Sequence, residues 1–350
     1  MTLPAVSVVI CVHNGESHVA RALESVFAQR FDDGFEVIVV NDGSTDGTRA
    51  VLERFSGRIR VIDQQNRGVS ATRNVGIRAA VGEYIALLDA DDTWTEDKLA
   101  KTVPLLEQSA SSVAVFSDAA IVEIPGRTPL PNYIAPRFQH SPTLDEMFKP
   151  PSWPILPSAT VVRRGTMLEI GGFPEEFAAS DYGCEDTFAF ILMRERGELV
   201  FVPDKLVRYR MPEWEVKLIK RMGPLSFNGG GESGGRLTDP YSYFRGNRVF
   251  SQLMRERFGA RGRELADFVA GGAARELVML GMKAMHEGDR AYARRCYLSS
   301  MRHRPSELRT YFRLAWAALP ASITQMLSLM LTPGLRRSLS GPPFLDERAQ

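Results

Sequence analysis

The sequence predicts an α/β protein with a mostly parallel sheet in its N-terminal part and helices in its C-terminal part. Three observations support this fold class. The first 120 residues alternate apolar, β-branched runs with amphipathic helical segments, a pattern typical of βαβ units. Polar residues follow these runs directly, at the strand ends where such sheets bind ligands. Past residue 240, only helical patterns remain.

Each expected element can be placed on the chain. The order is strand 6–10, helix 19–29, strand 35–40, a helix carrying Val51, Leu52 and Phe55, strand 60–62, helix 71–80 and strand 84–88. We expect Asp46 to be the N-cap of the second helix. From about residue 120 to 160, frequent prolines predict a loop-rich stretch with short strands. A helix over 185–196 and a strand over 199–202 follow.

A glycine-rich run at 228–235 separates this α/β part from the helical part. The run contains no Gly-Lys-Ser/Thr, so it is not a phosphate-binding P-loop. We expect four segments, namely an α/β domain over 1–225, a linker or lid over 226–240, a helical region over 241–340 and a tail over 341–350.

Composition and charge define the broad class of the protein. The chain is 44% hydrophobic and 24% charged, as is usual for a globular protein. A net charge of +1 by itself argues neither for nor against a nucleic-acid partner, and we expect none. Cys11, Cys184 and Cys296 form no disulfide framework, and the N-terminus lacks the features of a signal peptide. We expect a cytoplasmic protein, either free or at the inner face of the membrane.

The strongest chemical signal is the acidic run that ends the strand 84–88. Residues i and i+2 of an extended chain point the same way, so Asp89 and Asp91 share a face. Two neighbouring carboxylates repel each other unless a cation or a proton intervenes. Hard oxygen ligands suit Mg²⁺ or Mn²⁺, with water and substrate phosphates completing the coordination. The alternative is a solvated acidic turn in which Thr93 or Thr95 caps the next helix.

Three further segments carry candidate side chains, each with a simpler structural explanation. Asp42 follows the second strand and can accept hydrogen bonds from a base or ribose, with Gly43 allowing close approach; the alternative is a plain turn. Arg73, in the first turns of a helix, either meets a pyrophosphate or locks an acidic pair within the fold. Glu185 and Asp186 begin a helix, where carboxylates are stabilised as anions, and helix capping alone would explain them.

Taken together, these segments resemble the family 2 glycosyltransferases, which have the GT-A fold. The matching segments, in the order and at the spacings of that family, are 6–16, 36–46, 66–74 and 88–94, followed by Ile170-Gly171-Gly172-Phe173 and Glu185-Asp186. The resemblance covers roughly residues 5–211. It implies an inverting transferase. It also implies a non-processive one, because the Gln-x-x-Arg-Trp of processive synthases is absent.

The resemblance also implies a role for each candidate residue. Asp42 would bind the uracil or ribose, and Asp89 and Asp91 would be the D-x-D pair at the ribose and at a bound Mn²⁺ or Mg²⁺. Asp186 would be the catalytic base that takes the proton of the acceptor hydroxyl. The implied donor-side residues are His13, Asn14, Glu16, Asp42, Gly43, Ser44, Arg73 and Asp89, and the implied acceptor-side residues are Glu185, Gly172 and Trp94.

The implied reaction is transfer of one sugar from a nucleotide-diphosphate sugar, expected to be a UDP-sugar, to a hydroxyl of a glycan or lipid-linked acceptor in cell-surface polysaccharide biosynthesis. Cys11 and His13 stand where the family usually has Pro and an aromatic residue, and Pro212 stands where a His often follows. These departures affect the base-stacking contact and a third protein ligand of the metal. The alternatives are a catalytically silent glycan- or nucleotide-binding module and an enzyme that makes nucleotide sugars.

The C-terminal third has a strongly basic segment. Residues 290–339 contain nine Arg and a single acidic residue, Glu307, and residues 314–331 carry no charge. Three interpretations remain open at this point. The segment is a basic amphipathic surface that docks peripherally on an anionic membrane, a helical cap on the first domain, or, less favoured because polar residues and Pro320 interrupt it, a membrane span.

Overall fold

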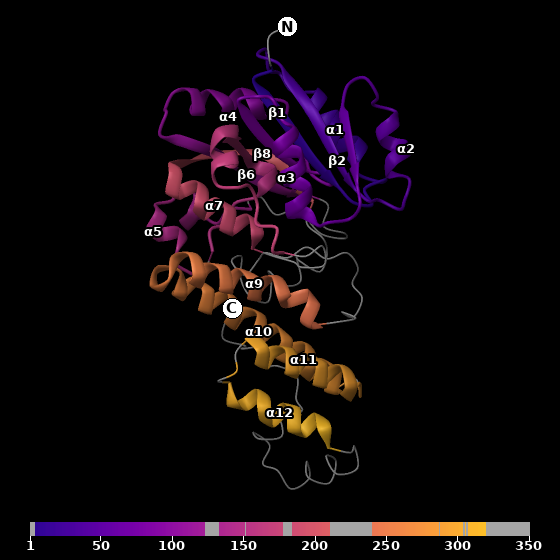
Figure 1. Cartoon of the computed structure of the whole chain (residues 1–350), viewed down its shortest axis with the longest axis vertical. Coiled ribbons are helices and arrows are strands. Elements are labelled where there is room, and N and C mark those ends of the chain that lie inside the picture. The colour runs from indigo at the N-terminus through magenta and orange to yellow at the C-terminus, as the bar shows by residue number, and fades with distance from the viewer. Residues whose placement is uncertain are drawn as a thin grey trace. The chain divides into compact units, whose positions relative to one another are not determined.

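The computed structural model describes residues 4–122, 133–150, 152–177, 184–210, 240–286, 288–303, 305 and 307–319. The chain divides into two compact units, Met1–Gly234 and Gly235–Gln350 (Figure 1). The division falls in the glycine-rich segment 226–240, which lies outside the described residues up to position 239, as does the expected tail 341–350. The bounds of the four segments expected from the sequence therefore stay predictions.

An eight-stranded sheet is the centre of the first unit. Its strands are β1 (Val6–Val12), β2 (Phe35–Asp42), β3 (Arg60–Gln64), β4 (Tyr84–Asp89), β5 (Thr93–Trp94), β6 (Ser112–Val122), β7 (Thr160–Arg163) and β8 (Glu198–Arg210). Their order in the sheet is β3-β2-β1-β4-β7-β6-β8-β5. The β3-β2-β1-β4 half is parallel, as the apolar runs predict. In the other half β7 and β5 run antiparallel to their neighbours, so the sheet is mixed.

The helices of the first unit cover both faces of this sheet. They are α1 (Val19–Phe27), α2 (Thr48–Glu53), α3 (Val69–Ala79), α4 (Lys98–Glu107), α5 (Leu144–Met147), α6 (Arg164–Glu169) and α7 (Glu185–Arg196), with 3-10 turns η1 (Pro136–Phe138) and η2 (Pro157–Ala159). Side chains alternate between the faces of a strand, and β1 is buried on both. Val8 and Ile10 pack in the same cluster as α1 and α4, whereas a Cβ at Gly76 of α3 would meet Val9.

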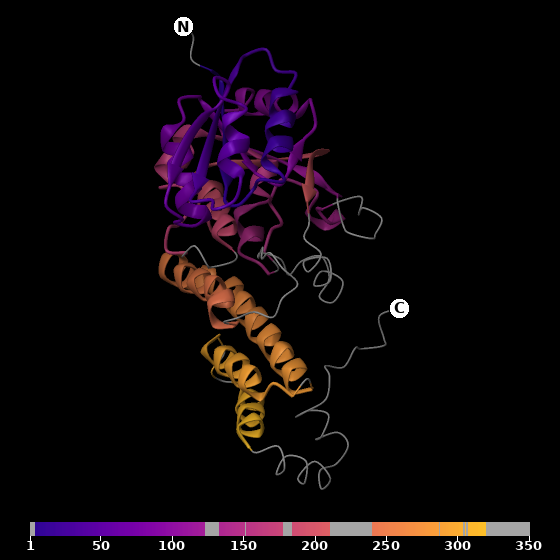
Figure 2. The same cartoon turned by 90° about the vertical axis from the view of Figure 1, so that its right-hand side faces the viewer.

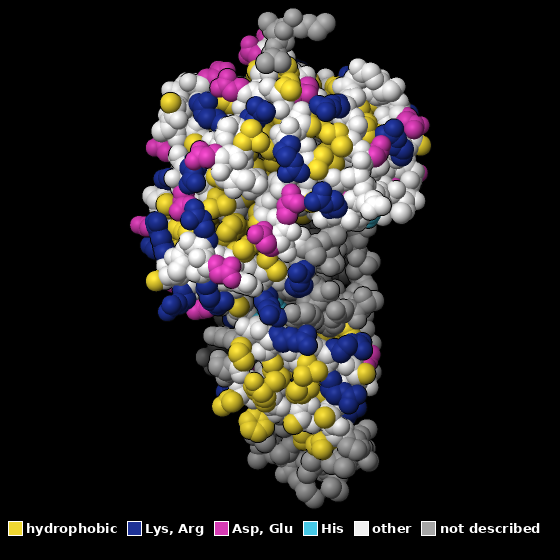
Figure 3. Space-filling view, in the orientation of Figure 1, with side chains coloured by type: hydrophobic (Ala, Val, Ile, Leu, Met, Phe, Trp, Pro, Cys, Tyr) yellow, Lys and Arg dark blue, Asp and Glu magenta, His cyan; other side chains and the backbone are white. Residues whose placement is uncertain are grey.

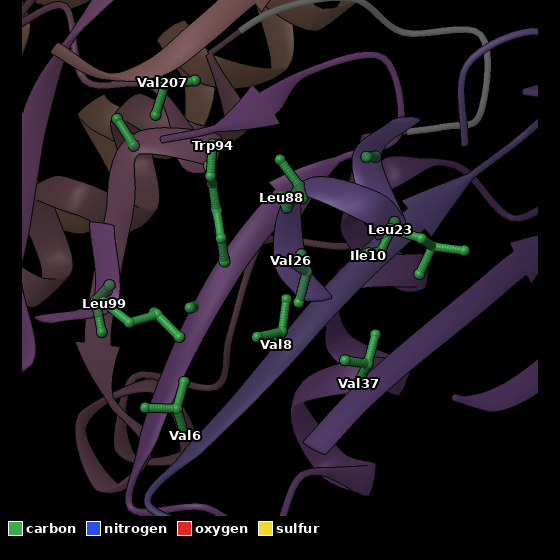
Figure 4. Packing of buried hydrophobic residues seen from close by; sticks show 14 of the residues in the cluster. Val6, Val8, Ile10, Leu23, Val26, Val37, Leu88, Trp94, Leu99 and Val207 are labelled. Carbon is green, nitrogen blue, oxygen red and sulfur yellow. The ribbon is translucent and has the colours of Figure 1, made fainter. Parts of the chain in front are cut away.

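The apolar core explains why the β1 run forms a central strand. Val6, Val8 and Ile10 are fully buried beside Leu23 and Val26 of α1 (Figure 4). Burial of each such side chain stabilises the fold by roughly 1.5–3 kcal/mol. β1 buries one polar side chain, Ser7, whose hydroxyl donates to Glu36 at 2.6 Å, and the other polar groups follow beyond the end of the strand. That arrangement places the candidate site at one edge of the sheet.

Several expected elements are confirmed and some details are wrong. The helix expected over 185–196 has those bounds, and the strands expected at 6–10, 35–40, 60–62 and 84–88 are present with small extensions. Asp46 is not the N-cap of α2, because the cap position is Gly47; its carboxylate instead accepts a hydrogen bond from the backbone N–H of Thr48, at 3.0 Å. Between Val122 and Thr160, the described residues form turns and short helices but no strand.

The second unit is helical throughout its described part, as expected from the sequence. Its helices are α9 (Pro240–Phe258), α10 (Ala260–His286), α11 (Arg290–His303) and α12 (Leu308–Ala318). Helix α10 packs against both α9 and α11, and α12 packs against α11 (Figure 2). In the described part of the chain, no helix combines the length and the hydropathy that crossing a bilayer requires.

Candidate active site

The candidate site lies where β2, β1 and β4 end side by side. Cys11 of β1 is in register with Asp89 of β4, and Val12 is in register with Asn41 of β2. The polar residues after β1 therefore emerge between Asp42 on one side and Asp89 on the other. Because these strands are parallel, all three carboxyl ends face the same edge of the sheet.

Asp42 organises the loop that leads into α3. Its carboxylate is 4% exposed and accepts hydrogen bonds from the backbone N–H groups of Arg67 and Gly68, at 2.9 and 3.0 Å, and from the amide of Gln64, at 2.6 Å. Gly43 has a φ of +70°, and a Cβ there would lie 2.7 Å from the backbone nitrogen of Asn66. The close approach that Gly43 permits is therefore made by the protein's own backbone.

The two loops beyond β1 and β2 are joined by reciprocal hydrogen bonds. The backbone N–H of Asn14 donates to the hydroxyl of Ser44 at 2.9 Å, and the side-chain oxygen of Asn14 accepts from the N–H of Thr45 at 2.8 Å. Glu16 accepts from the N–H of Gly47 at 2.9 Å. Asn14 has a φ of +53°, a conformation that these contacts hold. Most of the candidate donor-side residues are thus held in place by hydrogen bonds between their loops.

His13 is an exposed residue of this group. Its Nδ1 lies 2.8 Å from the carbonyl oxygen of Asp42, so the ring is held by β2. The amide nitrogen of Asn66 lies 3.4 Å from the same ring nitrogen. A flat, oriented and exposed imidazole at the mouth of the loops is suited to stacking on a planar ligand.

Arg73 links the end of β4 to the start of α7. One of its terminal nitrogens donates to Asp89 at 3.0 and 3.4 Å, and the other donates to Glu185 at 3.1 Å. The Arg73 side chain is 6% exposed and lies over the ring of Phe173, 5.0 Å from its centroid. Of the two roles considered from the sequence, the structure shows Arg73 locking an acidic pair.

The charges of this cluster are balanced locally. Burial alone would lower the pKa of Arg73, but the ion pairs with Asp89 and Glu185 outweigh burial and raise it. The cation therefore stays charged and holds Glu185, whose side chain is 12% exposed. Removing one partner of such a buried group leaves an uncompensated charge, which is strongly destabilising.

The first residues of α7 bring Asp186 to the same place. Cys184, directly before the helix, has a left-handed backbone with a φ of +71°, which is uncommon for a residue other than glycine. The carboxylate of Asp186 accepts a hydrogen bond from the backbone N–H of Thr187 at 2.6 Å. Burial, and then the neighbouring Glu185, raise the pKa of Asp186 to about 7, against an opposing effect of Arg73. A carboxyl group with such a pKa can accept a proton near neutral pH.

Gly172 and Phe173 attach the loop before α7 to α3. The side-chain oxygen of Asn74 accepts from the N–H of Phe173, and its nitrogen donates to the carbonyl of Phe173, both at 2.8 Å. Gly172 has a φ of +79°, and a Cβ there would lie 2.2 Å from the Asn74 oxygen. Gly172 was expected on the acceptor side, and its contact in the structure is with Asn74.

The acidic run after β4 contains three carboxylates in different surroundings. Asp89 is paired with Arg73, Asp91 is exposed, and Asp92 is 1% exposed and accepts from the backbone N–H of Arg210 at 2.9 Å. Burial, and then the charges of Asp91 and Asp89, raise the pKa of Asp92 well above its usual range. Of the three residues, Asp91 is the exposed one.

Asp89 and Asp91 fit a hard divalent cation by their chemistry. In the described residues, no group of three or more His, Cys, Asp or Glu side chains is arranged to hold a metal ion by itself. A site with one or two carboxylates, completed by water and substrate phosphates, is the usual arrangement for Mg²⁺. Pro212, where a further ligand was in question, lies outside the described residues.

Trp94 lies beneath the acidic run and is 2% exposed. Its indole nitrogen donates to the carbonyl of Ser158 at 2.8 Å, and the hydroxyl of Ser158 accepts from the N–H of Asp89 at 3.0 Å. Lys98 is fully buried nearby and donates to the carbonyl of Ala159 at 3.0 Å. Trp94 was expected on the acceptor side, and in the structure it supports the end of β4 through Ser158.

The structure thus assembles Asp42, Arg73, Asp89, Asp186 and their neighbours at one edge of the sheet. Sequence reasoning missed three supporting residues, namely Gln64, Ser158 and Lys98. Asn74 was part of a matching segment without an assigned role. A single polar residue inside a strand or helix was the only signal available for them.

Residues 7–164 match the family model described as glycosyl transferase family 2. The N-terminal domain belongs to this family. The curated succinoglycan biosynthesis protein ExoO of Rhizobium meliloti is 36% identical over 128 residues, which are 36% of this chain and 36% of ExoO. The chain spans between 36% and 41% of the length of three curated relatives.

Two solved structures show the same fold over most of the chain. S. aureus TarS 1–349, in complex with UDP-GlcNAc, is 18% identical with a TM-score of 0.58, covering 88% of this chain and 90% of TarS. The mannosyltransferase PcManGT from Pyrobaculum calidifontis, in complex with GDP-Man and Mn²⁺, is 16% identical with a TM-score of 0.51, covering 91% and 89%. The family 2 domain therefore has a GT-A fold, as the matching segments imply.

Proposed function

We propose that this chain transfers a single sugar from a nucleoside-diphosphate sugar, in the first instance a UDP-sugar, to a hydroxyl of a glycan or lipid-linked acceptor. The observation that carries the proposal is the bridge from Asp89 through Arg73 to Glu185, which brings the end of β4 and the start of α7 together. ExoO, a family relative, is named for succinoglycan biosynthesis, which supports a role in making a surface polysaccharide.

The donor would lie across the ends of β1, β2 and β4. His13 is exposed and oriented to stack on the base, and Asp42 would bind the uracil or ribose through the loops that it holds. Asp91 and Asp89 would hold a Mn²⁺ or Mg²⁺ ion, which stabilises the negative charge of the leaving diphosphate. The Mn²⁺ in PcManGT supports a metal of this kind.

Asp186 would act on the acceptor. Its carboxylate takes the proton of the acceptor hydroxyl while the hydroxyl oxygen forms a bond to the anomeric carbon. The bond from that carbon to the diphosphate oxygen breaks, and its electron pair leaves with the nucleoside diphosphate. One in-line displacement inverts the anomeric carbon, and Glu185 would keep its ion pair with Arg73, which is 3.1 Å long in the structure.

The first experiment is calorimetric titration of the whole chain with UDP, with and without Mn²⁺. We expect binding that depends on the metal and that Asp91→Ala removes. Asp32→Ala, which changes an exposed aspartate before β2, is the matched control and should bind as the unchanged protein does. If UDP fails to bind under either condition while GDP binds, the base assignment is wrong; if neither binds, the donor site itself is wrong.

The role of Asp186 is tested separately from donor binding. Asp186→Asn should leave UDP affinity nearly unchanged and slow transfer by roughly 10²–10⁴-fold. Because the base must be ionised, transfer by the unchanged protein should increase as the pH rises through about 7, the pKa given above. Intact UDP binding with no transfer by the unchanged protein would instead support a catalytically silent module.

A further inference from the structure

Helices α11 and α12 of the second unit pair through one face each. Tyr292, Ala293, Cys296 and Tyr297 of α11 are buried in a cluster with Ala317 of α12. Arg290 anchors the pair, because its guanidinium donates to the carbonyl of Trp316 at 2.9 Å. The opposite faces of both helices are therefore turned away from this core.

The outward face of α12 is apolar. Leu308 is 70% exposed, Phe312 68% and Tyr311 42%, and residues at these spacings lie on one side of a helix. Leu298 of α11 is 47% exposed. Figure 3 shows hydrophobic side chains gathered over α11 and α12, with Lys and Arg side chains beside them. Contiguous exposed apolar groups of this kind mark an interaction surface.

The same outward side of α11 is basic. Arg294, Arg295 and Arg302 are exposed there, and Arg309 is exposed on α12. Neither helix contains an Asp or a Glu. Residues 240–319 together carry 15 Lys and Arg against seven Asp and Glu, although the whole chain has a net charge of only +1. The positive charge is thus concentrated in this unit.

Exposed arginines of the first unit have a different environment. Arg30 pairs with Glu96, Arg49 with Asp63 and Arg67 with Glu175, at 2.5 to 3.1 Å. Those pairs cancel charge at the surface, whereas neither α11 nor α12 contains an Asp or a Glu within its bounds; the nearest ones along the chain, Asp289 and Glu307, directly precede the two helices. We name the exposed residues Arg294, Arg295, Leu298, Arg302, Leu308, Arg309, Tyr311 and Phe312 the α11–α12 outer face.

We propose that the α11–α12 outer face docks on an anionic lipid bilayer. Leucine and aromatic side chains enter the interfacial region, and arginines contact the headgroups, which is how basic amphipathic helices bind membranes. The same face of a second copy carries the same positive charge, so two copies of this face would repel each other. The inference goes beyond the proposed transfer reaction, because it concerns a different unit of the chain and depends on none of the donor-site residues.

The test is co-sedimentation of the full chain with lipid vesicles. One set contains phosphatidylcholine only, and the other contains about one third phosphatidylglycerol. We expect binding to the anionic vesicles that weakens as salt is added, and little binding to the neutral ones. No binding to anionic vesicles at low salt, or equal binding to both sets, would overturn the proposal.

Two pairs of substitutions locate the binding surface. Arg294→Gln with Arg295→Gln should weaken vesicle binding roughly thirtyfold. Leu308→Ser with Phe312→Ser should weaken it by about tenfold or more. Arg263→Gln and Phe268→Ser, which change exposed residues of α10, are the matched controls and should bind as the unchanged chain does. Equal losses in the controls would contradict the assignment of this face.

Three further measurements separate this proposal from its alternatives. Helical circular dichroism checks that each variant folds. Light scattering checks the oligomeric state, and a change from dimer to monomer in Leu308→Ser with Phe312→Ser, with vesicle binding retained, would make the face an interface between copies. UDP titration of the same variants should be unchanged, so loss of vesicle binding is distinguishable from failure of the donor site.

Discussion

At the edge of the sheet, Arg73 is 6% exposed and lies between Asp89 and Glu185, whereas on α11 Arg294 and Arg295 face outward from a helix without acidic residues. The partners of Arg73 come from positions 16 and 112 residues away along the chain. The exposed arginines of α11 form a basic surface because their own helix contains no acidic residue. One region uses charge to fix geometry, and the other presents charge to a partner.

The difference teaches where substitutions should be costly. A buried charge has lost its water, so its stability depends on the partner that replaced that water. An exposed charge keeps its water, and its removal changes what the surface attracts but little else. Changes at the sheet edge should therefore alter the free energy of unfolding, and changes on the α11–α12 outer face should alter binding only.

The largest effect is expected from Arg73→Met. It leaves Asp89 and Glu185 without their shared cation and should lower the free energy of unfolding by about 3–5 kcal/mol. Arg78→Met, on the same helix but at a side chain that is 55% exposed, should change it by less than about 0.5 kcal/mol. Urea denaturation followed by tryptophan fluorescence measures both. Equal effects of the two substitutions would break the comparison between buried and exposed arginines.

Lys98 offers a test by pH. Burial lowers its pKa from 10.5 to about 7, so between these values the unfolded chain holds a proton that the folded chain does not. Stability should therefore rise with pH in this window, by about 2–3 kcal/mol from pH 7 to 9. Lys98→Met should remove that rise.

The control is Lys101→Met on the same helix. Hydrogen bonds to Asp204 and Asp97 hold the pKa of Lys101 above its usual range, so this lysine stays protonated throughout the window. The variant should keep the rise of stability with pH. Denaturation curves of both variants at pH 7 and 9 measure the change in the free energy of unfolding. If this free energy still rises with pH in Lys98→Met, another group causes the rise.

Gly172 and Gly171 separate backbone strain from a steric clash. Both have a positive φ, but a Cβ at Gly172 would lie 2.2 Å from the Asn74 oxygen, and a Cβ at Gly171 would have open space. We expect Gly171→Ala to cost about 1 kcal/mol and Gly172→Ala about 2 kcal/mol, because the latter also displaces Asn74 from Phe173. If thermal denaturation gives both the same cost, the Asn74 contact contributes little.

The smallest effect is expected on α12. Phe312→Ser should change the free energy of unfolding by no more than about 0.5 kcal/mol, since the side chain is 68% exposed. Trp316→Ser, on the same helix, changes a side chain that is 8% exposed and should cost about 3 kcal/mol or more. Loss of helical circular dichroism on heating measures both. A large decrease in the free energy of unfolding for Phe312→Ser would mean that another part of the folded chain covers this side chain.

The residues that follow β1, β2 and β4 were identifiable from the sequence because an apolar run and the polar turn after it are adjacent in the chain. Helical patterns, which are also local, predicted α7 and the helical character of the second unit. The sequence could not choose between the two roles of Arg73, since each needs a partner from another element. Nor could it place Trp94, which the resemblance assigned to the acceptor side and which is buried beneath the acidic run.

By itself, the sequence determined three things: the alternating strands and helices, the family of the N-terminal domain, and the basic character of the last helices of the chain. These follow from periodicity, composition and motifs, which are properties of neighbouring residues. Only the tertiary structure decided that Arg73 joins Asp89 to Glu185, that Ser158 holds the end of β4 and that Asn74 fixes Phe173. Those contacts join residues 16 to 112 positions apart, and packing of the sheet and its helices brings them within hydrogen-bonding distance.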